Sequence, residues 1–262
     1  MALTEKQKVE LSQALIKAQI TATPITKVTD QYPDMTIDEA YDVQMLTLQT
    51  RIKSGDPVVG RKIGLCTKAK QQRLGIDEPI YGHLFASMVV PELDPISLSR
   101  LCRPVIEGEL AFVLKNDLKG PVTLASVMAS IAGVIPAMEI ADSRYKEKQK
   151  KVQDSILDNS GASMVMLGGQ FTSIDGIDLR QLGLILEQDG EVIASDAAVN
   201  ILGNPIQPIV NLVNKLAGYD IGLSAGEFII SGTPHDAVPV VAGSCYRATW
   251  DRMGYISVRF TE

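Results

Sequence analysis

The sequence predicts an α+β protein, in which a mixed β-sandwich or roll follows a small helical N-terminal segment. Three observations lead to this prediction. Two helical patterns occupy the first quarter of the chain, short strand patterns dominate the rest, and strands and helices do not alternate strictly. The lack of strict alternation argues against a doubly wound parallel sheet. We expect a helical cap over residues 1–57 and a mixed-sheet catalytic core over residues 58–262.

Both expected N-terminal helices begin with the same capping signature. Thr4 is followed three residues later by Gln7, and Thr36 by Glu39, so each pair can satisfy free amide groups in a first helical turn. Apolar residues then recur at helical spacing, at Leu11, Leu15, Ile16 and Ala18 in the first helix and at Ala40, Val43, Leu46 and Leu48 in the second. The second helix should end near the glycine and proline of segment 55–57.

Short apolar runs bounded by turn residues predict the strands of the core. They cover residues 109–114, 163–167, 183–187, 191–194, 227–231, 238–241 and 255–260. Asp189-Gly190 lies between two of these runs and predicts a hairpin turn. Helices are expected at 124–132 and from Pro205 or Pro208 to Gly218, the second with proline in its first turn and glycine just past its end.

The composition indicates a folded protein without a nucleic-acid partner. The chain has 262 residues, 45% hydrophobic and 21% charged, which is enough apolar material for one large domain or a domain with a small cap. Its net charge is -6 and no basic patch stands out. Lysine and arginine do gather in residues 144–151, which we interpret as a solvated helix face or loop; a lid or partner contact is the alternative.

The N-terminal sequence and the cysteines indicate a protein of the reducing cytoplasm. The first residues, MALTEKQKVELSQAL, lack the apolar segment of a signal peptide. No apolar run approaches the roughly 20 residues needed to span a bilayer, so no membrane partner is expected. Cys66, Cys102 and Cys245 are odd in number and far apart, which indicates neither a zinc ribbon nor a disulfide framework.

Three acidic residues form the pattern with the clearest chemical meaning. Glu107 and Glu109 are two residues apart, and on a strand this spacing points both carboxylates to one face. Glu139 is an isolated charge inside the apolar segment 135–140. Buried carboxylates repel one another, and a divalent cation that prefers oxygen ligands would resolve this. The alternative is a solvent-facing pair on an edge strand with an unrelated surface glutamate.

Other polar groups could complete such a site. Lys62 lies between two nearby glycines that allow close backbone approach, and a lysine beside a metal-bound anion stabilises negative charge; a surface lysine at a strand start is the alternative. Arg144, in the segment 142–144, could clamp a carboxylate through two hydrogen bonds. Segment 158–161 (DNSG) could supply further hydrogen bonds, although turn chemistry explains it equally well.

Several familiar catalytic and cofactor motifs are missing from the sequence. His83 and His235 do not form a His-x-x-x-His pair, which excludes a zincin. The sequence also contains no Gly-x-Ser-x-Gly elbow, no Gly-x-Gly-x-x-Gly fingerprint and no P-loop. A nucleotide or nicotinamide cofactor is therefore not indicated.

Several segments, in the same order, resemble the fumarylacetoacetate hydrolase superfamily. Within it, the chain is most similar to the branch of 2-hydroxypenta-2,4-dienoate hydratases and 4-oxalocrotonate decarboxylases. The similarity covers nearly the whole chain and rests on the cap stretch Lys27–Tyr41, Gly60–Leu65 (GRKIGL), Ile106–Glu109 (IEGE), Pro136–Glu139 (PAME), Asp142–Arg144 (DSR), Asp158-Asn159 and Gly254–Phe260 (GYISVRF). Because these segments occur together and in the same order, the resemblance is more specific than a match to any single segment would be.

The resemblance implies a fold, a metal and an oligomer. It implies the mixed β-sandwich or roll of this family, with a helical N-terminal region, and Mg²⁺ or Mn²⁺ held by Glu107, Glu109 and Glu139. Lys62 matches an active-site lysine. For the small 2-oxo or 2-hydroxy-dienoic acid substrate we expect contacts from Leu65, Arg144, Asn159, Ser160 and His235. A homo-oligomer is also implied.

The branch also implies a choice between two lyase reactions. Its hydratases carry Pro-Asp-Phe/Tyr-Gly, whereas this chain has Pro79-Ile80-Tyr81-Gly82, similar to the decarboxylases. We therefore expect metal-dependent decarboxylation of 2-oxohex-3-enedioate to 2-hydroxypenta-2,4-dienoate in aromatic meta-cleavage catabolism, with a homologous hydratase as a possible partner. The alternatives are a 2-hydroxypenta-2,4-dienoate hydratase, an acylpyruvase-type carbon–carbon hydrolase that would use His83 or His235, and a non-catalytic partner subunit.

Overall fold

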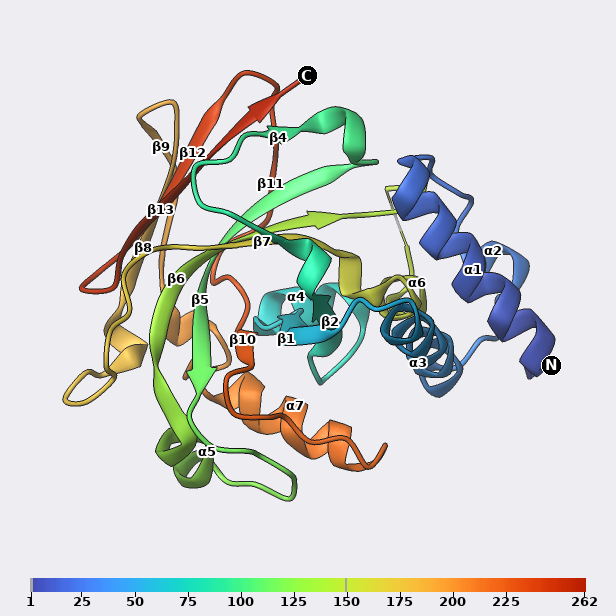
Figure 1. Ribbon diagram of the computed structural model, residues 1–262, viewed down its shortest axis with the longest axis horizontal. Coiled ribbons are helices and arrows are strands. Elements are labelled where there is room, and N and C mark those ends of the chain that lie inside the picture. The colour runs from blue at the N-terminus through green and yellow to red at the C-terminus, as the bar shows by residue number, and fades with distance from the viewer. Residues whose placement is uncertain (1, 149) are drawn as a thin grey trace.

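Two β-sheets form the centre of the protein, which the computed structural model describes over residues 2–148 and 150–262 (Figure 1). The strands are β1 (Val58–Gly64), β2 (Ile80–Phe85), β3 (Val89–Val90), β4 (Ile96–Ser97), β5 (Pro104–Leu114), β6 (Ile131–Asp142), β7 (Ala162–Leu167), β8 (Gly183–Gln188), β9 (Glu191–Ala197), β10 (Phe228–Ile230), β11 (Val238–Pro239), β12 (Cys245–Trp250) and β13 (Gly254–Thr261). The larger sheet has the order β2-β1-β10-β5-β6-β7-β3, with β11 paired to β5. The smaller sheet has the order β4-β13-β12-β8-β9.

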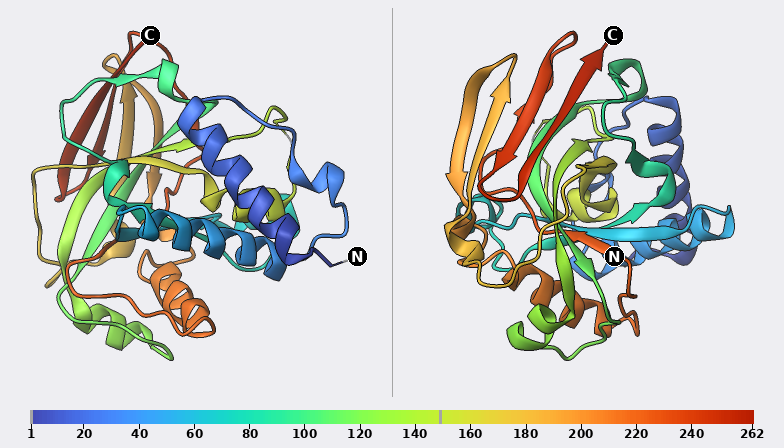
Figure 2. Two further views of the ribbon diagram at one scale, coloured as in Figure 1. Left: turned by 45° about the vertical axis from the view of Figure 1, so that its right-hand side comes forward. Right: turned by 60° about the vertical axis from the view of Figure 1, so that its left-hand side comes forward.

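Helices lie at the edges of these sheets (Figures 1 and 2). They are α1 (Glu5–Thr21), α2 (Val28–Gln31), α3 (Ile37–Lys53), α4 (Lys68–Leu74), α5 (Leu124–Ser130), α6 (Val152–Leu157) and α7 (Gln207–Ala217). Both predicted capping boxes are present, at Thr4 with Gln7 and at Thr36 with Glu39. Proline lies in the first turn of α7 and Gly218 caps its end, as the sequence predicts.

The α+β prediction is confirmed, because the sheets mix parallel and antiparallel neighbours. β1 pairs parallel with β10 and antiparallel with β2, and β5 pairs antiparallel with β6. Asp189 and Gly190 both adopt positive φ in the turn between β8 and β9, as the predicted hairpin requires.

The strand patterns missed β1, β2, β3, β4, β6 and β12, and the helical patterns missed α2, α4 and α6. β6 shows the reason most clearly. It lies between β5 and β7 in the larger sheet, and most of its residues are buried on both faces. A strand buried on both faces has no alternation of polar and apolar residues, so its apolar run cannot be distinguished from a buried helix.

Gly108 explains how β5 packs against the smaller sheet. A Cβ atom at this position would lie 2.9 Å from the Cβ of Ala248 on β12 and 3.2 Å from a methyl carbon of Leu184 on β8. Only a residue without a side chain permits this approach. Because side chains alternate along a strand, the residues on either side of Gly108 point away from the smaller sheet.

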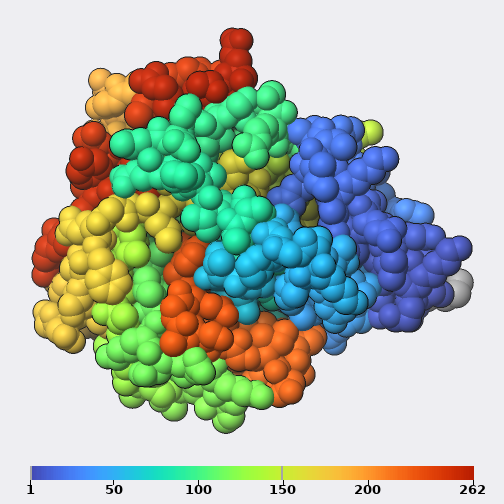
Figure 3. All heavy atoms as spheres, in the orientation of Figure 1, coloured from blue at the N-terminus to red at the C-terminus, as the bar shows by residue number. Residues whose placement is uncertain are grey.

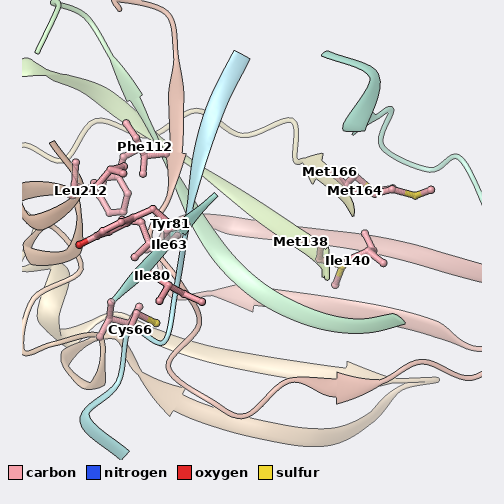
Figure 4. Packing of buried hydrophobic residues seen from close by; sticks show 14 of the residues in the cluster. Ile63, Cys66, Ile80, Tyr81, Phe112, Met138, Ile140, Met164, Met166 and Leu212 are labelled. Atoms are coloured by element: carbon pink, nitrogen blue, oxygen red, sulfur yellow. The ribbon is translucent and has the colours of Figure 1, made fainter. Parts of the chain in front are cut away.

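A large apolar core joins β1, β2 and β5 to helix α7. Figure 4 shows Ile63 and Tyr81 beside Phe112 of β5 and Leu212 of α7. All four side chains are buried, with at most 3% of their surface exposed. This packing holds β1 and β2 in place, and these strands carry Lys62 and Ile80 to the site described below.

The N-terminal helices pack on the core through α6. Helix α1 packs on α3, and α3 packs on α6. The buried amide of Gln44 in α3 donates to the carbonyl oxygens of Tyr81 and Ile156, at 2.8 and 2.7 Å. Figure 3 shows these helices at one end of the molecule and the C-terminal strands at the opposite end. The division into a cap (1–57) and a core (58–262) stays a prediction.

Among the described residues, no helix combines the length and the apolar content that a bilayer crossing requires.

Candidate metal and substrate site

Glu107, Glu109 and Glu139 come together on the face of β5 and β6 that points away from the smaller sheet. Glu107 lies directly opposite Glu139 in the strand register. One ligand oxygen from each of the three lies within 4.8 Å of the other two. Glu109 and Glu139 are fully buried, and Glu107 is partly exposed. The two-residue spacing thus brings Glu107 and Glu109 together on one face of β5, as the sequence predicts, and β6 contributes the third carboxylate.

Each of these carboxylates has one positively polarised neighbour. Lys62 of β1 lies 2.6 Å from Glu139 Oε1 and donates a hydrogen bond to the carbonyl of Ser160 at 2.8 Å. The backbone N–H of Gly232 donates to Glu109 Oε2 at 2.6 Å. Lys70 of α4 lies 3.5 Å from Glu107 Oε1. The carboxylates thus contact groups from three separate segments: β1, α4 and the loop that carries Gly232.

Burial and mutual repulsion perturb the titration of this cluster. Burial raises the pKa of Glu109 well above its usual range, and the charges of Glu139 and Glu107 raise it further. Burial also raises the pKa of Glu139, against the opposing charge of Lys62. Burial alone would lower the pKa of Lys62, but the charges of Glu139 and Glu107 outweigh it and raise this pKa. Ionised carboxylates are therefore disfavoured here unless a further cation binds.

The donor set fits a divalent cation. Two buried carboxylate oxygens, Glu109 Oε1 and Glu139 Oε2, have no hydrogen-bond partner among the described residues. Buried polar atoms are normally paired, so these two indicate a missing partner. Hard cations such as Mg²⁺ and Mn²⁺ take carboxylate oxygens as ligands.

Cationic side chains surround the entrance to this cluster. A pocket of about 820 Å³ opens beside Lys62 and Glu107. Five cations line it: Lys62, Lys70, Arg73, Lys148 and Lys150. Glu107 and Asp236 are the acids on its wall, and the apolar residues include Leu65 and Ile80. Such a pocket favours a small anion.

The sequence interpretation missed Lys70 and Arg73. Both belong to α4, which begins after Thr67 and follows the glycine-bearing strand β1 directly. They are three residues apart, so they share one helix face. The sequence did contain a signal for this helix, because threonine at position 67 is a favoured N-cap residue. In the structure its hydroxyl accepts a hydrogen bond from the backbone N–H of Lys70.

The interpretation of residues 144–151 as a solvated face is wrong at two positions. Arg144 is buried, with 3% of its surface exposed, and Lys150 is partly buried and lines the pocket. Lys148 is exposed at the pocket edge. These lysines therefore belong to the wall of the pocket.

Arg144 does not clamp a substrate carboxylate, and this prediction needs correction. Its Nε donates to Asp158 Oδ1 at 2.6 Å, and its Nη1 donates to the carbonyls of Asp142 and Ala162 at 2.7 and 2.9 Å. Its Nη2 donates to the carbonyl of Asp158. The folded chain brings Asp158 beside Arg144, and this internal carboxylate takes the place that we assigned to the substrate.

The Arg144–Asp158 pair predicts a large stability effect. We expect Arg144→Met to lower the free energy of unfolding by roughly 3–5 kcal/mol, because the buried Asp158 loses its counter-charge. Urea denaturation checks this. The matched control is Arg180→Met, which breaks a surface pair with Asp178 and should leave the midpoint unchanged. Equal effects of the two substitutions would contradict the structural role of Arg144.

The segment after Asp158 places Asn159 and Ser160 differently. The Asn159 side chain joins this segment to β2, since its Oδ1 accepts from His83 N at 2.8 Å and its Nδ2 donates to His83 O at 2.9 Å. Ser160 adopts φ 55° and lines the pocket, and its hydroxyl has no partner among the described residues. Leu65, with φ 57°, also lines the pocket. Substrate contact thus stays a prediction for Leu65 and Ser160, whereas the Asn159 amide is used internally.

Neither histidine lines the pocket beside the carboxylates. His83 is buried on β2, where burial and the charge of Arg61 lower its pKa to about 3. His235 lines an adjacent pocket of about 560 Å³ that shares Lys70, Arg73 and Asp236 with the first. Its Nδ1 lies 2.6 Å from the carbonyl of Asp236. His235 therefore does not line the main pocket, and the contact that we expected between His235 and the substrate would have to come from the adjacent pocket.

The fold and the carboxylate cluster define a class of protein. The chain belongs to the fumarylacetoacetate hydrolase family: the family model described as "Fumarylacetoacetate (FAA) hydrolase C-terminal" matches residues 59–261.

Two kinds of lyase are similar to the whole chain. A 4-oxalocrotonate decarboxylase of Pseudomonas sp. (strain CF600) is 36% identical, with 98% of each chain covered. A 2-keto-4-pentenoate hydratase of Paraburkholderia xenovorans (strain LB400) is also 36% identical, over 98% of this chain and 96% of the hydratase. A solved structure of 4-oxalocrotonate decarboxylase from Pseudomonas putida G7, complexed with magnesium and adipate, superposes with a TM-score of 0.95, at 36% identity and 98% coverage of each chain.

The raised carboxyl pKa values predict how metal binding depends on pH. In the metal-free protein, Glu109 and Glu139 bind protons more tightly when folded than when unfolded. Their contribution to stability is therefore complete below the ordinary carboxyl pKa and is lost as the pH rises through the folded values. Because a metal must displace these protons, we expect the thermal shift induced by Mg²⁺ to grow as the pH rises above the ordinary carboxyl pKa and through the raised values of the folded protein. A shift that is independent of pH would contradict this.

Proposed function

We propose that this protein is a divalent-metal-dependent lyase that decarboxylates 2-oxohex-3-enedioate to 2-hydroxypenta-2,4-dienoate. The observation that carries the proposal is a three-carboxylate cluster, with two members fully buried and Glu107 on the wall of a pocket lined by five cations. Support comes from the similarity to 4-oxalocrotonate decarboxylases, one of which was solved with magnesium and adipate, a six-carbon diacid.

Glu107, Glu109 and Glu139 would hold the metal, with Mg²⁺ or Mn²⁺ as the candidates. When bound, a divalent ion supplies positive charge to the 2-oxo acid end of the substrate and withdraws electrons from the reacting chain.

Lys62 has the position to stabilise the charge that develops during reaction. The bond between C5 and the distal carboxylate breaks, CO₂ leaves, and the electron pair moves through the conjugated chain to the C2 oxygen. The ammonium group of Lys62, beside Glu139 and on the pocket wall, stabilises this dienolate and can donate a proton to the C2 oxygen. That proton transfer gives the 2-hydroxydienoate product, and no general base is needed.

Ile80 favours decarboxylation over hydration. Its buried side chain lines the pocket, where an apolar wall excludes water and destabilises a carboxylate that is about to leave. A hydratase needs an acid or base near this position. Asp77 and Glu78 are exposed and line a smaller pocket that Ile80 also borders, outside the lining of the main pocket, and Glu78 pairs with Lys215 at 3.1 Å.

The hydrolase alternative has less support. It requires a histidine paired with a glutamate to activate water, but His83 and His235 lie outside the lining of the main pocket. A non-catalytic role is disfavoured by the cost of burying Glu109 and Glu139 beside Glu107, which Lys62 and Lys70 offset only in part.

The decisive experiment offers two substrates to the purified protein with Mg²⁺. We expect release of CO₂ from 2-oxohex-3-enedioate, followed together with substrate absorbance, and its loss in Glu107→Ala. Consumption of 2-hydroxypenta-2,4-dienoate without CO₂ from the diacid would instead identify a hydratase. No thermal response to EDTA followed by Mg²⁺ would favour the binding-only alternative.

We further infer a cytoplasmic enzyme that forms a homo-oligomer and can associate with a homologous hydratase. The three cysteines are free, which suits a reducing compartment. Size-exclusion chromatography with light scattering, alone and with the hydratase, tests both associations.

A further inference from the structure

We propose that Lys150 is the specificity-determining residue that recognises the second carboxylate of a diacid substrate. The proposal rests on the function proposed above, which places the 2-oxo acid end of the substrate at Glu107, Glu109 and Glu139. It concerns the opposite end of the same molecule and explains how the pocket would distinguish diacids from monoacids.

The first argument is the distribution of charge partners around the pocket. Lys62 pairs with Glu139, Lys70 with Glu107, and Arg73 with Asp236. Each of these three cations therefore already has an acidic partner.

The fourth cation, Lys148, is exposed at the pocket edge. Lys150 differs from all four, because it is partly buried and the described residues provide it with no ion pair. Its Nζ makes one long contact, at 3.4 Å, with the hydroxyl of Ser143. Burial lowers the pKa of Lys150; the charge of Asp158 opposes this, while Arg144 and Lys62 lower the pKa further. Asp158 itself is bound to Arg144 at 2.6 Å. A partly buried ammonium without a carboxylate partner is costly, and an anion entering the pocket would remove that cost.

The second argument is position. Lys150 and Lys62 line the same pocket, and Lys62 lies beside the carboxylate cluster. The neighbouring Lys151 holds this segment in place, since its backbone N–H donates to Asp154 Oδ2 at 3.1 Å and its Nζ to the carbonyl of Pro33 at 2.9 Å. Asp154 in turn accepts from the backbone and the hydroxyl of Thr29 at 2.9 and 2.6 Å. Contacts with Thr29 and Pro33 thus hold the backbone next to Lys150.

A pair of unreactive ligands isolates the second carboxylate. 2-Oxoadipate and 2-oxohexanoate share the 2-oxo acid end and a six-carbon chain, and only the first carries a carboxylate at C6. Neither has the conjugated double bond that decarboxylation requires, so calorimetry in the presence of Mg²⁺ measures binding alone.

We expect wild-type protein to bind 2-oxoadipate more tightly than 2-oxohexanoate. Lys150→Met should weaken 2-oxoadipate binding by about ten- to a hundred-fold, as expected for loss of a charged hydrogen bond, and change 2-oxohexanoate binding less than about two-fold. Lys150→Arg should retain most of the preference. Lys146→Met removes an equal charge from an exposed position of the same segment, outside the pocket lining, and should change neither affinity.

The monoacid serves as an internal control for folding, because its unchanged binding shows that the metal end of the site is intact. If Lys150→Met weakens both ligands equally, or leaves the diacid preference unchanged, the assignment of Lys150 is overturned. If the wild-type protein binds neither ligand, the proposed function fails instead, so the two failures are distinguishable.

Discussion

Glu109→Gln should abolish the response of the protein to divalent metal while making the metal-free form more stable. Glu109 is fully buried, its pKa is raised by burial and by Glu139 and Glu107, and its Oε1 has no hydrogen-bond partner among the residues that the structure describes. A neutral amide is a weaker metal ligand, so we expect activity to fall by at least about a thousandfold, equivalent to about 4 kcal/mol. The same change removes a repulsive charge, which stabilises the metal-free protein at neutral pH.

Thermal denaturation with EDTA and then with saturating Mg²⁺ measures both effects. In the wild type, metal at a hundred times its dissociation constant should add about 2.7 kcal/mol of stability. Glu109→Gln should show a higher melting temperature in EDTA and no shift with Mg²⁺. Glu191→Gln, on the exposed edge strand β9, is the charge-matched control and should behave as the wild type. A normal Mg²⁺ shift in Glu109→Gln would remove this residue from the metal site.

Lys62→Met should lower both catalysis and stability. Lys62 is buried at 2.6 Å from Glu139, so its loss leaves an uncompensated carboxylate. We expect the free energy of unfolding of the metal-free protein to fall by roughly 3–5 kcal/mol. Decarboxylation should fall by at least about a hundredfold, because the dienolate loses its positively charged neighbour. Metal affinity should rise, since Glu139 no longer has a competing cation.

The double variant Lys62→Met with Glu139→Gln separates the two roles. Removing both partners of the buried pair should restore much of the stability, since neither charge is left alone. Activity should stay low, because the lysine and a metal ligand are both missing. Urea denaturation and CO₂ release provide the two measurements. Full activity in Lys62→Met at a temperature where the variant is folded would show that Lys62 serves only to balance charge.

The expected substrate contacts were less predictable from the sequence than the carboxylate cluster. Alternation along one strand is a local property, and it suffices to place Glu107 and Glu109 on one face. Arg144 illustrates the contrast. Its side chain type suits a carboxylate clamp, but the fold places Asp158 and two carbonyl groups within its reach. Whether a guanidinium binds an internal carboxylate or a ligand depends on which distant residues the fold brings near it. A local sequence pattern does not contain that information.

The same distinction holds for the elements. The boundaries of helices α1, α3 and α7 can be predicted from local sequence, because capping hydroxyls, a proline in the first turn and glycines near the ends mark them. Strand β6 does not, because burial on both faces leaves a continuous apolar run. The strand that carries Glu139 was therefore missed, although the isolated charge within its apolar run was noticed.

The sequence by itself determined the fold class, the capped helices and the shared face of Glu107 and Glu109, since all of these follow from short-range periodicity and backbone chemistry. The tertiary structure alone decided that Glu139 lies opposite Glu107, that Arg144 is bound internally, and that Lys150 lines the pocket with no acidic partner in the described part of the chain. The physical reason is that burial and charge pairing depend on which distant segments meet. Strand register and loop packing determine which distant segments come into contact, and these contacts exist only in the folded chain.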